Sequence, residues 1–474
     1  MLCQSPFTPL DSLQDCNKLY QFLDFCKQQS IAEQHEKIAS ISSTIESIDP
    51  LAVLWQFGKP QQRHFYFENR DQERAIAAIG EARSIQIEGT RRFETAQEFI
   101  QRCLKHFVIS DASNLPWAQP CFFSSFTFFD QSTASNSYFP SAIVFLPQWQ
   151  IVQGSDRSAI LLHQVIEADT NIELLTEKIW RDFQSIQQIS YSFFHFSTQL
   201  PTLLNWEIVD THDFQSTVVA ALKSIQQQQL NKLVLAHAID VVSPLPFQWG
   251  HSLHNLRQLH PDCYVFSVGN GHGQSFVGAS PERLLSVCDR TLITDALAGS
   301  APRGRTLAED TELAQRLLNN DKERREHQVV VDFIHQTLAQ FGLKLRFTHV
   351  PDLLQLSNIQ HLHTPIQTVL PVGLHPLEIL AALHPTPAVA GLPREIACEQ
   401  IQQYEQFERS LYAAPIGWVD AQNNAEFVVG IRSALLDGNR ARLYAGAGIV
   451  SGSDPEREFA EVRLKLQALL RALV

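Results

Sequence analysis

The chain has 474 residues, of which 44% are hydrophobic and 18% charged, and its formal net charge at pH 7 is −13. These values are ordinary for a globular enzyme with a core large enough to be stable without disulfides. The acidic balance argues against bulk binding of nucleic acid or of an anionic membrane, although a local cluster of cations can still hold an anionic substrate.

The cysteines and the N-terminus point to a reducing compartment. The eight cysteines form no CxxC pair and no Cys/His cluster with the spacing of zinc ligands. We therefore expect reduced thiols and a cytoplasmic location. The first residues lack the basic and apolar regions of a secretory signal, and no apolar run of about 18 residues predicts a membrane span.

Residues 1–205 are rich in Gln, Ser and Phe and contain no string with recognisable chemistry. Hydrophobic patterning in this part predicts helices near 17–48, 93–107 and 171–190, and strands at 51–57, 121–129 and 141–147. The segment 187–206, interrupted by Pro201, is the predicted junction with the second part, residues 206–474.

The second part alternates hairpins with long helices. Its predicted elements, in order, are a helix at 213–230, a strand at 232–242, a hairpin at 263–280 around GNGHG, strands at 283–288 and 291–297, a helix over 308–340, and strands at 414–420, 426–435 and 441–450. Asp454 and Pro455 have the residue types of a helix N-cap and first helical position. The pattern predicts an α+β fold of mainly antiparallel sheets packed together, with helices on the outside.

The predicted final helix carries charged residues on one face. Glu458, Glu461 and Lys465 have the i, i+3, i+7 spacing of one helical face, although Glu461 and Lys465 alone would make an ordinary surface ion pair. The string before this helix contains three glycines, Gly446, Gly448 and Gly452. We expect these to form a turn near the helix N-terminus, whose N–H groups could bind an anion.

Three further ionisable residues have both an ordinary and a chemical interpretation. Glu326, in the helical string DKERREH, belongs either to a solvated face or to a Mg²⁺ site shared with a glutamate of another helix. Lys232 begins an apolar strand, where it is an exposed edge residue or, among apolar neighbours, a usable base. Glu282, after Ser280 and Pro281, is a turn carboxylate or a general acid.

Several strings from about 213 to 471 occur together in one enzyme family. They are GASPERLL (278–285), LAGSAPRGR (297–305), DKERREH (321–327), QHLHTP (360–365), LHPTPAVAGLPR (383–394), ERSLYAAPIGWVD (408–420) and RLYAGAGIVSGSDPEREFAEVRLKL (442–466). In these strings the chain resembles the chorismate-binding enzymes, which include isochorismate, salicylate, anthranilate and aminodeoxychorismate synthases. The first part resembles them only loosely, through CFFSSFTFFD and FPSAIVFLPQW. The resemblance implies one large chorismate-utilising fold, completed by 1–205 and carrying its catalytic residues in 206–474.

The resemblance implies a role for each ionisable residue. Lys232 resembles the base that activates water for attack at C2 of chorismate, and Glu282 the acid that protonates the departing C4 hydroxyl. Glu326 and Glu461 resemble the ligands of a Mg²⁺ cofactor, with Glu458 as a further contributor through water. His361 resembles a histidine near the substrate ring. The groups that resemble the holders of the enolpyruvyl carboxylate are Tyr412, Arg432, Lys465 and the backbone of Gly446 and Gly448.

Three positions favour one member of the family. Amine-forming relatives do not keep the water-activating lysine, so Lys232 favours water as the nucleophile. Ser300, in AGSAPRG, is typical of isochorismate synthases, and Ala388 stands where salicylate-forming relatives tend to carry threonine. We therefore predict a Mg²⁺-dependent, reversible isochorismate synthase, an isomerase acting on chorismate.

Alternatives remain open at this point. They are a salicylate synthase, an anthranilate or aminodeoxychorismate synthase component with a separate glutaminase partner, and a non-catalytic chorismate-binding subunit. The last would have lost a catalytic residue, whereas Lys232, Glu282, Glu326 and Glu461 are all present. The family precedent also suggests a monomer, and we favour a product that enters menaquinone or phylloquinone biosynthesis over one that enters siderophore synthesis.

Overall fold

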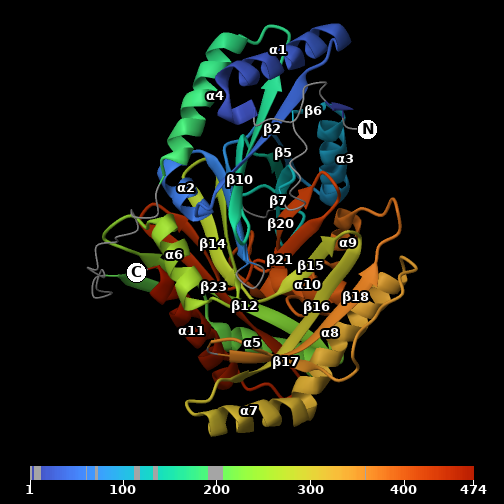
Figure 1. The fold of residues 1–474 in the computed structure, drawn as a ribbon. Coiled ribbons are helices and arrows are strands. Elements are labelled where there is room, and N and C mark those ends of the chain that lie inside the picture. The colour runs from blue at the N-terminus through green and yellow to red at the C-terminus, as the bar shows by residue number, and fades with distance from the viewer. Residues whose placement is uncertain are drawn as a thin grey trace.

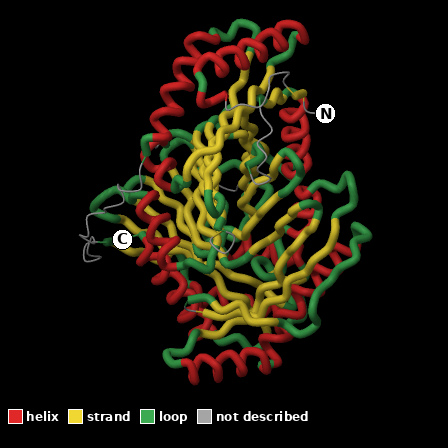
Figure 2. The backbone as a smooth tube through the Cα atoms, viewed as in Figure 1, coloured by secondary structure: helices red, strands yellow, loops and turns green. Residues whose placement is uncertain are grey.

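The computed structural model describes residues 3–4, 12–59, 61–69, 73–110, 118–131, 137–189, 206–357 and 359–473. Most of the predicted junction at 187–206 lies outside these residues. The described strands form two large sheets at the centre of the molecule, and helices lie around them (Figure 1; Figure 2). The predicted α+β class, with mainly antiparallel sheets and helices outside, is confirmed.

The first sheet is long and uses both parts of the chain. Among the described residues its order is β1 (Cys3–Gln4), β6 (Phe107–Ile109), β2 (Lys37–Glu46), β10 (Arg157–Ile166), β9 (Trp149–Gln153), β4 (Arg74–Ile79), β3 (Arg63–Asn69), β13 (Tyr264–Asn270), β14 (Gln274–Ser280), β22 (Ser433–Asp437), β23 (Arg440–Val450), β12 (Lys232–Val242) and β11 (Glu207–Asp210). The short strand β19 (Gly391–Leu392) also pairs with β12. Within this described sheet only β6 pairs in parallel, with β1 and β2.

The second sheet also joins the two parts. Its order is β17 (Asp352–Gln355), β18 (Ile359–Val369), β16 (Thr291–Pro302), β15 (Arg283–Cys288), β21 (Ala425–Val429), β20 (Pro415–Asp420), β7 (Cys121–Phe126), β8 (Ala142–Leu146) and β5 (Arg83–Ile87). Strand β3 pairs with β13 in the first sheet, and β7 pairs with β20 in the second. The division at residue 205 stays a prediction, but both sheets run across it.

Helices cover the outer faces and the two ends of the molecule (Figure 1). They are α1 (Cys16–Glu33), α2 (Pro50–Phe57), α3 (Arg92–Lys105), α4 (Ile172–Gln187), α5 (Phe214–Gln226), α6 (Trp249–Leu259), α7 (Leu307–Asn319), α8 (Asp321–Ala339), α9 (Pro376–Leu383), α10 (Arg394–Tyr404) and α11 (Pro455–Ala472), with a short 3₁₀ turn at Ser12–Gln14. In the described part of the chain, no helix has both the length and the apolarity that crossing a membrane requires.

The core lies between the two sheets and is rich in aromatic rings. Phe65 of β3 and Phe123 of β7 are fully buried, and their ring centroids lie 4.9 Å apart across the sheet interface. Each buried aromatic side chain removes a large apolar area from water, and such ring pairs add to that stabilisation. The Phe-rich runs of residues 1–205 therefore supply packing that fixes the second part in place.

Two predicted elements in the first part are wrong in type or extent. The run at 51–57 is the helix α2 and not a strand, because Asp49 caps it by accepting from Leu51 N at 3.0 Å and Pro50 opens it. A short apolar run cannot be assigned by periodicity alone. The helix predicted near 17–48 ends at Glu33, where Gln34 has φ 55°, and 37–46 is strand β2.

One long predicted helix is two helices in the structure. The segment 308–340 contains α7, which follows the cap Thr306, and α8, which begins after Asn320. The Asn320 side chain accepts from Lys322 N at 2.9 Å and Glu323 N at 3.2 Å, so it starts α8 directly after α7 has ended. The new axis directs the first turns of α8 toward β16, with which this helix packs.

Most of the other predicted elements of the second part agree with the structure, apart from the strand at 426–435, which is divided in two. Helix α5, strand β12, the β13–β14 hairpin, strands β15 and β16 and helix α11 occupy their predicted positions. Asp454 caps α11 by accepting from Glu456 N at 2.9 Å and Arg457 N at 3.0 Å, as its position predicted.

Candidate active site

The site is built on two paired strands and the helix that follows them. Strands β12 and β23 are antiparallel, with Ala236 opposite Gly446 and Val234 opposite Gly448. Helix α11 follows β23 after a short turn and packs back on it. This arrangement brings Lys232, at the start of β12, close to the helical face predicted to carry Glu461 and Lys465.

One cavity at this junction collects the predicted site residues. All of them except Glu458 contribute to its lining, which includes Lys232, Glu282, Glu326, His361, Ala388, Tyr412, Arg432, Gly446, Gly448, Glu461 and Lys465. They come from both sheets and from α8, α11 and the loop after α9. Their chemical roles remain predictions, which the geometry below makes specific.

Lys232 is a buried residue, not the exposed edge residue of the ordinary interpretation. Its side chain is 2% exposed, and its Nζ lies 2.7 Å from Oε1 of Glu326, which reaches it from α8. The two predicted roles compete in this arrangement, because the carboxylate that would bind a metal is occupied by the predicted base. A change of partner at Glu326 would therefore affect both functions together.

Glu282 lies in the same cavity and is 5% exposed. Its backbone N–H donates to Ser280 Oγ at 3.2 Å, which fixes the turn that follows β14. Burial raises the pKa of Glu282 to about 8; the Lys232 ammonium opposes this rise and the charge of Asp295 adds to it. Glu282 is therefore protonated at neutral pH, the state in which a carboxyl group can donate a proton.

Carboxylates from α8 and α11 meet at one end of the cavity. Behind Glu326 and Glu461 lie Glu323 and Glu458, each three residues away on the same helix. Burial raises the pKa of Glu323 and of Glu458, and the negative charges of Glu326 and Glu461 add to both shifts. Burial also acts to raise the pKa of Glu461, but the adjacent Lys465 ammonium outweighs it and the net shift is downward.

Glu323 was missed by sequence reasoning. Its Oε2 accepts from Ser300 N at 3.1 Å, which joins α8 to the end of β16. The signal that could have found it is its i, i+3 spacing from Glu326 in DKERREH, the same spacing that singled out Glu458 and Glu461.

The carboxylate cluster fits a hard divalent cation. Within the described ranges, no three His, Cys, Asp or Glu side chains converge as a complete protein-made metal site would require. Glu326 and Glu461 are instead paired with Lys232 and Lys465, at 2.7 and 2.8 Å. Mg²⁺ commonly takes one or two carboxylates together with water and substrate oxygens. Such a cation would relieve the repulsion from Glu326 and Glu461, which adds to the rise that burial causes in the pKa of Glu323 and of Glu458.

Arg432 makes another part of the cavity wall cationic. Arg432 lies between β21 and β22 with φ 48°, so the strand predicted at 426–435 is interrupted there and becomes two strands. Its Nη1 contacts Cys263 Sγ at 3.7 Å, and none of the described carboxylates is paired with its guanidinium. A half-buried arginine without an acidic partner suits a bidentate anion, such as a substrate carboxylate.

Gly446 and Gly448 lie in strand β23 and not in a turn, which corrects the prediction; of the three glycines only Gly452 is in the turn. Gly446 is opposite Ala236 and Gly448 is opposite Val234 in β12. The Ala236 N–H donates to Glu405 Oε1 and the Val234 N–H donates to Ala390 O, so neither donates to β23. These are non-hydrogen-bonded pairs, so the N–H groups of both glycines point away from β12. Lys465 Nζ donates to Gly446 O at 2.9 Å on that same side.

His361 presents an unsatisfied polar atom to the site. It lies on β18 opposite Ser300, and its buried Nε2 has no hydrogen-bond partner among the described residues. Burial, together with the charges of Arg432 and Lys465, lowers the pKa of His361 to about 3. The ring is therefore neutral, and Nε2 is available to a ligand. Ala388, half-buried, lies in the same cavity wall.

A buried ion pair that sequence reasoning missed holds this framework together. Arg409 is 1% exposed; it donates to Glu405 Oε2 at 2.8 Å, Val234 O at 2.8 Å and Val389 O at 2.9 Å. It thus ties β12 to the loop that carries Ala388. The spacing of Glu405 and Arg409, i and i+4, is visible in the sequence but is common on protein surfaces.

The ring of Phe128 lies 4.3 Å from the Arg409 guanidinium. Phe128 also accepts through its backbone oxygen from His384 Nε2 at 3.1 Å. Residues 1–205 therefore contribute packing to the catalytic framework, although none of the predicted catalytic residues lies there.

Replacing Gly448 by alanine is expected to lower turnover about tenfold or more. A Cβ at this position would lie 2.8 Å from Glu326 Oε1 and 3.2 Å from Lys232 Cε, so the ion pair would have to move. A misplaced ion pair would no longer hold the geometry that the proposed proton transfer needs, and each ~1.4 kcal/mol added to the barrier is a factor of ten in rate. Steady-state kinetics measures the loss, and thermal unfolding checks that the fold is kept. Unchanged kinetics would contradict the close contact.

Comparison with known proteins assigns the family. A sequence profile described as chorismate binding enzyme matches residues 23–474. The chain belongs to the chorismate binding enzyme family. This result confirms the resemblance in the motifs of the second part, and it extends the family match through most of residues 1–205.

Relatives within the chorismate binding enzyme family include several isochorismate synthases. The chain is 30% identical over 448 residues to isochorismate synthase MenF of Bacillus subtilis, covering 93% of this chain and 94% of that protein. It is 41% identical over 268 residues to the salicylate biosynthesis isochorismate synthase of Pseudomonas aeruginosa, covering 56% of this chain and 55% of the other.

Solved structures of family members agree. The structure of MenF, the menaquinone-specific isochorismate synthase from Escherichia coli, superposes with a TM-score of 0.76 at 26% identity and covers 96% of this chain and 100% of the other. Anthranilate synthase component I from Streptococcus pneumoniae shares the fold, with a TM-score of 0.66 at 21% identity, covering 85% of this chain and 93% of that one.

Proposed function

We propose that this chain is an isochorismate synthase, an isomerase that converts chorismate to isochorismate reversibly. The proposal rests on the presence of a proton donor and a candidate base in one cavity. Burial keeps Glu282 protonated, and a buried lysine, Lys232, lines the same cavity. The full-length similarity to an isochorismate synthase supports the same reaction. Anthranilate synthase and salicylate synthase are the rival activities that an experiment must separate.

The reaction exchanges one hydroxyl for another. Water attacks C2, the ring double bonds shift, and the C4 hydroxyl leaves as water once it has been protonated. In our proposal the Lys232 amine takes a proton from the attacking water, and Glu282 gives its proton to the leaving hydroxyl. The proton gained by Lys232 and the one lost by Glu282 are then exchanged with solvent, so the net reaction is an isomerisation.

Chorismate is a dianion, and we assign its enolpyruvyl carboxylate to the cationic side of the cavity. Arg432 and Lys465 would supply the charge, Tyr412 a hydroxyl, and Gly446 and Gly448 their N–H groups. The free Nε2 of His361 would bond the substrate beside its ring. These contacts would orient the substrate, and they take no part in the proton transfers.

We assign a Mg²⁺ ion to the carboxylate end. Glu326 and Glu461 would hold it, with Glu458 and Glu323 acting from the next helical turn. When bound, the ion would supply the positive charge that holds the ring carboxylate. Glu326 would then no longer be committed to Lys232, which leaves the lysine amine free for water.

Product analysis tests this proposal. Purified protein is incubated with chorismate and Mg²⁺, with and without ammonium, and the products are separated by chromatography. We expect isochorismate under both conditions. Salicylate with pyruvate would instead identify a salicylate synthase, and ammonium-dependent anthranilate would identify an amine-forming enzyme. Chorismate left unchanged would identify a binding subunit.

Removing the metal is expected to abolish the activity of the enzyme. Excess chelator should abolish isochorismate formation, because Glu323, Glu326, Glu458 and Glu461 would then repel the ring carboxylate with no cation between them. Activity should return with added Mg²⁺. Circular dichroism before and after chelation serves as the control for folding. Full activity in chelator would refute the metal assignment.

We also propose a monomeric, cytoplasmic enzyme of quinone biosynthesis. The cysteine side chains that the structure describes form no disulfide with one another, in accord with a reducing compartment. The structure of MenF from E. coli, which is similar to this chain in fold, is described as menaquinone-specific, and this supports the quinone assignment for this chain. Light scattering on the eluted protein tests the oligomeric state, and complementation of a menaquinone-deficient strain tests the pathway.

A further inference from the structure

A second cavity lies beside the active site along α11. Its walls are mostly apolar: Ala301, Pro302 and Ile359 come from the ends of β16 and β18, and Ala460, Leu464 and Leu469 come from the helix. Leu464 is 66% exposed, so the cavity is open to solvent on this side. None of the roles proposed above uses these apolar residues.

The two cavities share one wall. Ser300, Arg432, Glu461 and Lys465 line both of them. These four residues are half-buried, whereas Lys232, Glu282 and Tyr412, deeper in the active-site cavity, are 2%, 5% and 4% exposed. Solvent therefore meets the shared wall first and the catalytic pair last. Two of the shared residues are the cations proposed to hold the substrate carboxylate.

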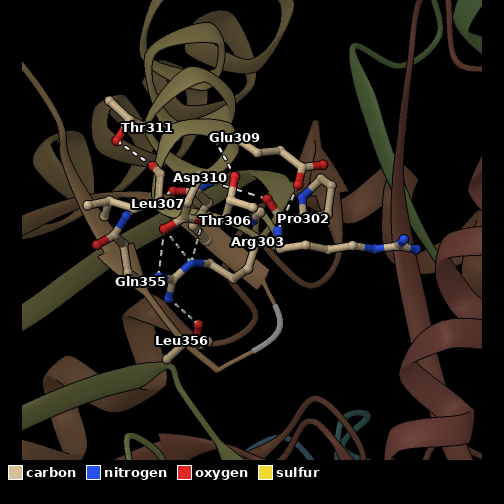
Figure 3. A network of polar contacts seen from close by, with 12 residues as sticks. Pro302, Arg303, Thr306, Leu307, Glu309, Asp310, Thr311, Gln355 and Leu356 are labelled. Carbon is tan, nitrogen blue, oxygen red and sulfur yellow. Dashed lines mark hydrogen bonds and ion pairs between the residues drawn. The ribbon is translucent and has the colours of Figure 1, made fainter.

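The wall formed by β16 and β18 is held firmly. Arg303, which follows Pro302, donates through Nε and Nη2 to Asp310 at 2.8 and 2.7 Å and through Nη1 to Leu356 O at 2.6 Å (Figure 3). Gln360 Nε2 donates to Pro302 O at 3.2 Å. These bonds anchor Pro302 to α7 and to the turn before β18, so the cavity is a preformed part of the fold.

The second cavity is lined by cations, from its solvent side to the wall that it shares with the active-site cavity. The chain carries a net charge of −13, so a dianion approaching at random meets a repulsive field. Arg457 is exposed in the first turn of α11 and contributes to the outer cavity, ahead of Arg432 and Lys465 on the shared wall. Of the three cations, Arg457 lines only the second cavity, whereas Arg432 and Lys465 line both cavities.

We propose that this second cavity is the passage by which the substrate enters and the product leaves, and that Arg457 collects the dianion at its mouth. The inference rests on the proposed function only in taking chorismate as the ligand. A passage affects the rates of entry and exit and leaves the affinity of the inner site unchanged. That distinction makes it testable separately from catalysis.

Trapping is the decisive experiment. Ala460, which is exposed and lines only the second cavity, is replaced by cysteine. Ala460→Cys enzyme is equilibrated with radiolabelled chorismate and Mg²⁺, treated with a bulky thiol reagent that reductant can remove, and desalted. We expect about one labelled ligand per chain to be retained and then released by reductant, because the adduct closes the passage behind it.

The matched control is Gln467→Cys, an exposed position on the same helix that lines neither cavity. Its adduct should retain no label, and wild-type protein given the same reagent accounts for the natural thiols. When the reagent is added before the substrate, the Ala460→Cys adduct should lose at least ~90% of turnover and recover it on reduction. Loss of label as fast as in the control, or full turnover of the adduct, would overturn the passage.

Arg457 is tested by ionic strength. Arg457→Gln should lower kcat/KM about three- to tenfold at low salt, with the difference closing as salt screens the charge. Arg463→Gln, on the same helix but outside both cavities, should leave kcat/KM and its salt dependence unchanged. Equal salt dependence in the two variants would remove Arg457 from the passage.

The proposed function and the passage fail in different ways. Consumption of chorismate and retention of label are followed whatever the product, so salicylate or anthranilate would refute the function and leave the passage standing. Isochorismate formed at the wild-type rate by the Ala460→Cys adduct would refute the passage and leave the function standing.

Discussion

Lys232→Ala is expected to lower kcat by a factor of about 10²–10⁴, the range that a general base contributes, while chorismate still binds. The base is lost, but Arg432, Lys465 and the N–H groups of β23 that are proposed to hold the enolpyruvyl carboxylate remain. Glu326 loses its 2.7 Å partner and becomes free for the metal. The measurements are steady-state kinetics and calorimetric titration with chorismate.

Lys232→Gln is the matched variant for this prediction. Glutamine nearly fills the buried space and can still donate a hydrogen bond to Glu326, but it cannot take a proton from water. Both variants should therefore be inactive, with dissociation constants within a few-fold of wild type. Activity close to wild type in Lys232→Gln would remove Lys232 from the role of base and limit it to holding Glu326.

Glu282→Gln should abolish hydroxyl exchange to a similar extent. The substitution keeps the shape of the side chain and removes the proton that the C4 hydroxyl needs to leave. The amide is neutral, as is the protonated Glu282 of the native cavity, so binding and thermal stability should change little. Retained exchange would exclude Glu282 as the acid. Glu323→Gln, which removes a half-buried carboxylate behind the cavity, tests whether the loss of any nearby carboxylate has the same effect.

The pH dependence of the wild-type enzyme follows from the same residue. The pKa of Glu282 is raised to about 8, so the carboxyl is protonated below that pH and ionises above it. Catalysis that needs the protonated form is therefore present at neutral pH and is lost as the pH rises through about 8. This limb should be seen in kcat/KM, which reports the free enzyme. A profile flat to pH 10 would contradict the assignment.

The sequence predicted which residues line the cavity more closely than it predicted their contacts. Lys232 could be placed at the start of a strand because the residues after it are apolar and β-forming, and the structure begins β12 there. That Glu326 would be its partner could not be predicted, since the contact depends on how α8 packs on β16. Packing of this kind is set by tertiary structure, which local patterns do not encode.

Backbone geometry was the second source of error. Residues 426–435 read as one apolar strand, but Gly430 and Arg432 interrupt it, and Arg432 takes a positive φ that few residues other than glycine adopt. Such a conformation persists only where surrounding structure fixes it. The three glycines before α11 suggested a turn, yet the close approach of Glu326 and Tyr412 to Gly448 and Gly446 explains two of them.

The first part of the chain was the least predictable. Only two of its strands, β7 and β8, were predicted, and β1, β2, β3, β4, β5, β6, β9 and β10 were missed. Residues 51–57 show why. The run is almost entirely apolar, so its periodicity does not distinguish a strand from a helix, and the helix start at Asp49 and Pro50 decides between them. None of the proposed catalytic residues lies in this part, so its errors do not affect the site.

The pairing of β3 with β13 and of β7 with β20 also affects how the chain is made. During synthesis the first part leaves the ribosome with β3 and β7 lacking these neighbours, which are translated much later. Contacts so distant in sequence form slowly, and an unpaired apolar strand edge invites association with other chains in the meantime. The yield of folded protein therefore depends on the time between translation of β3 and β7 and translation of their partners, and on the chaperones that cover the unpaired strands during that time.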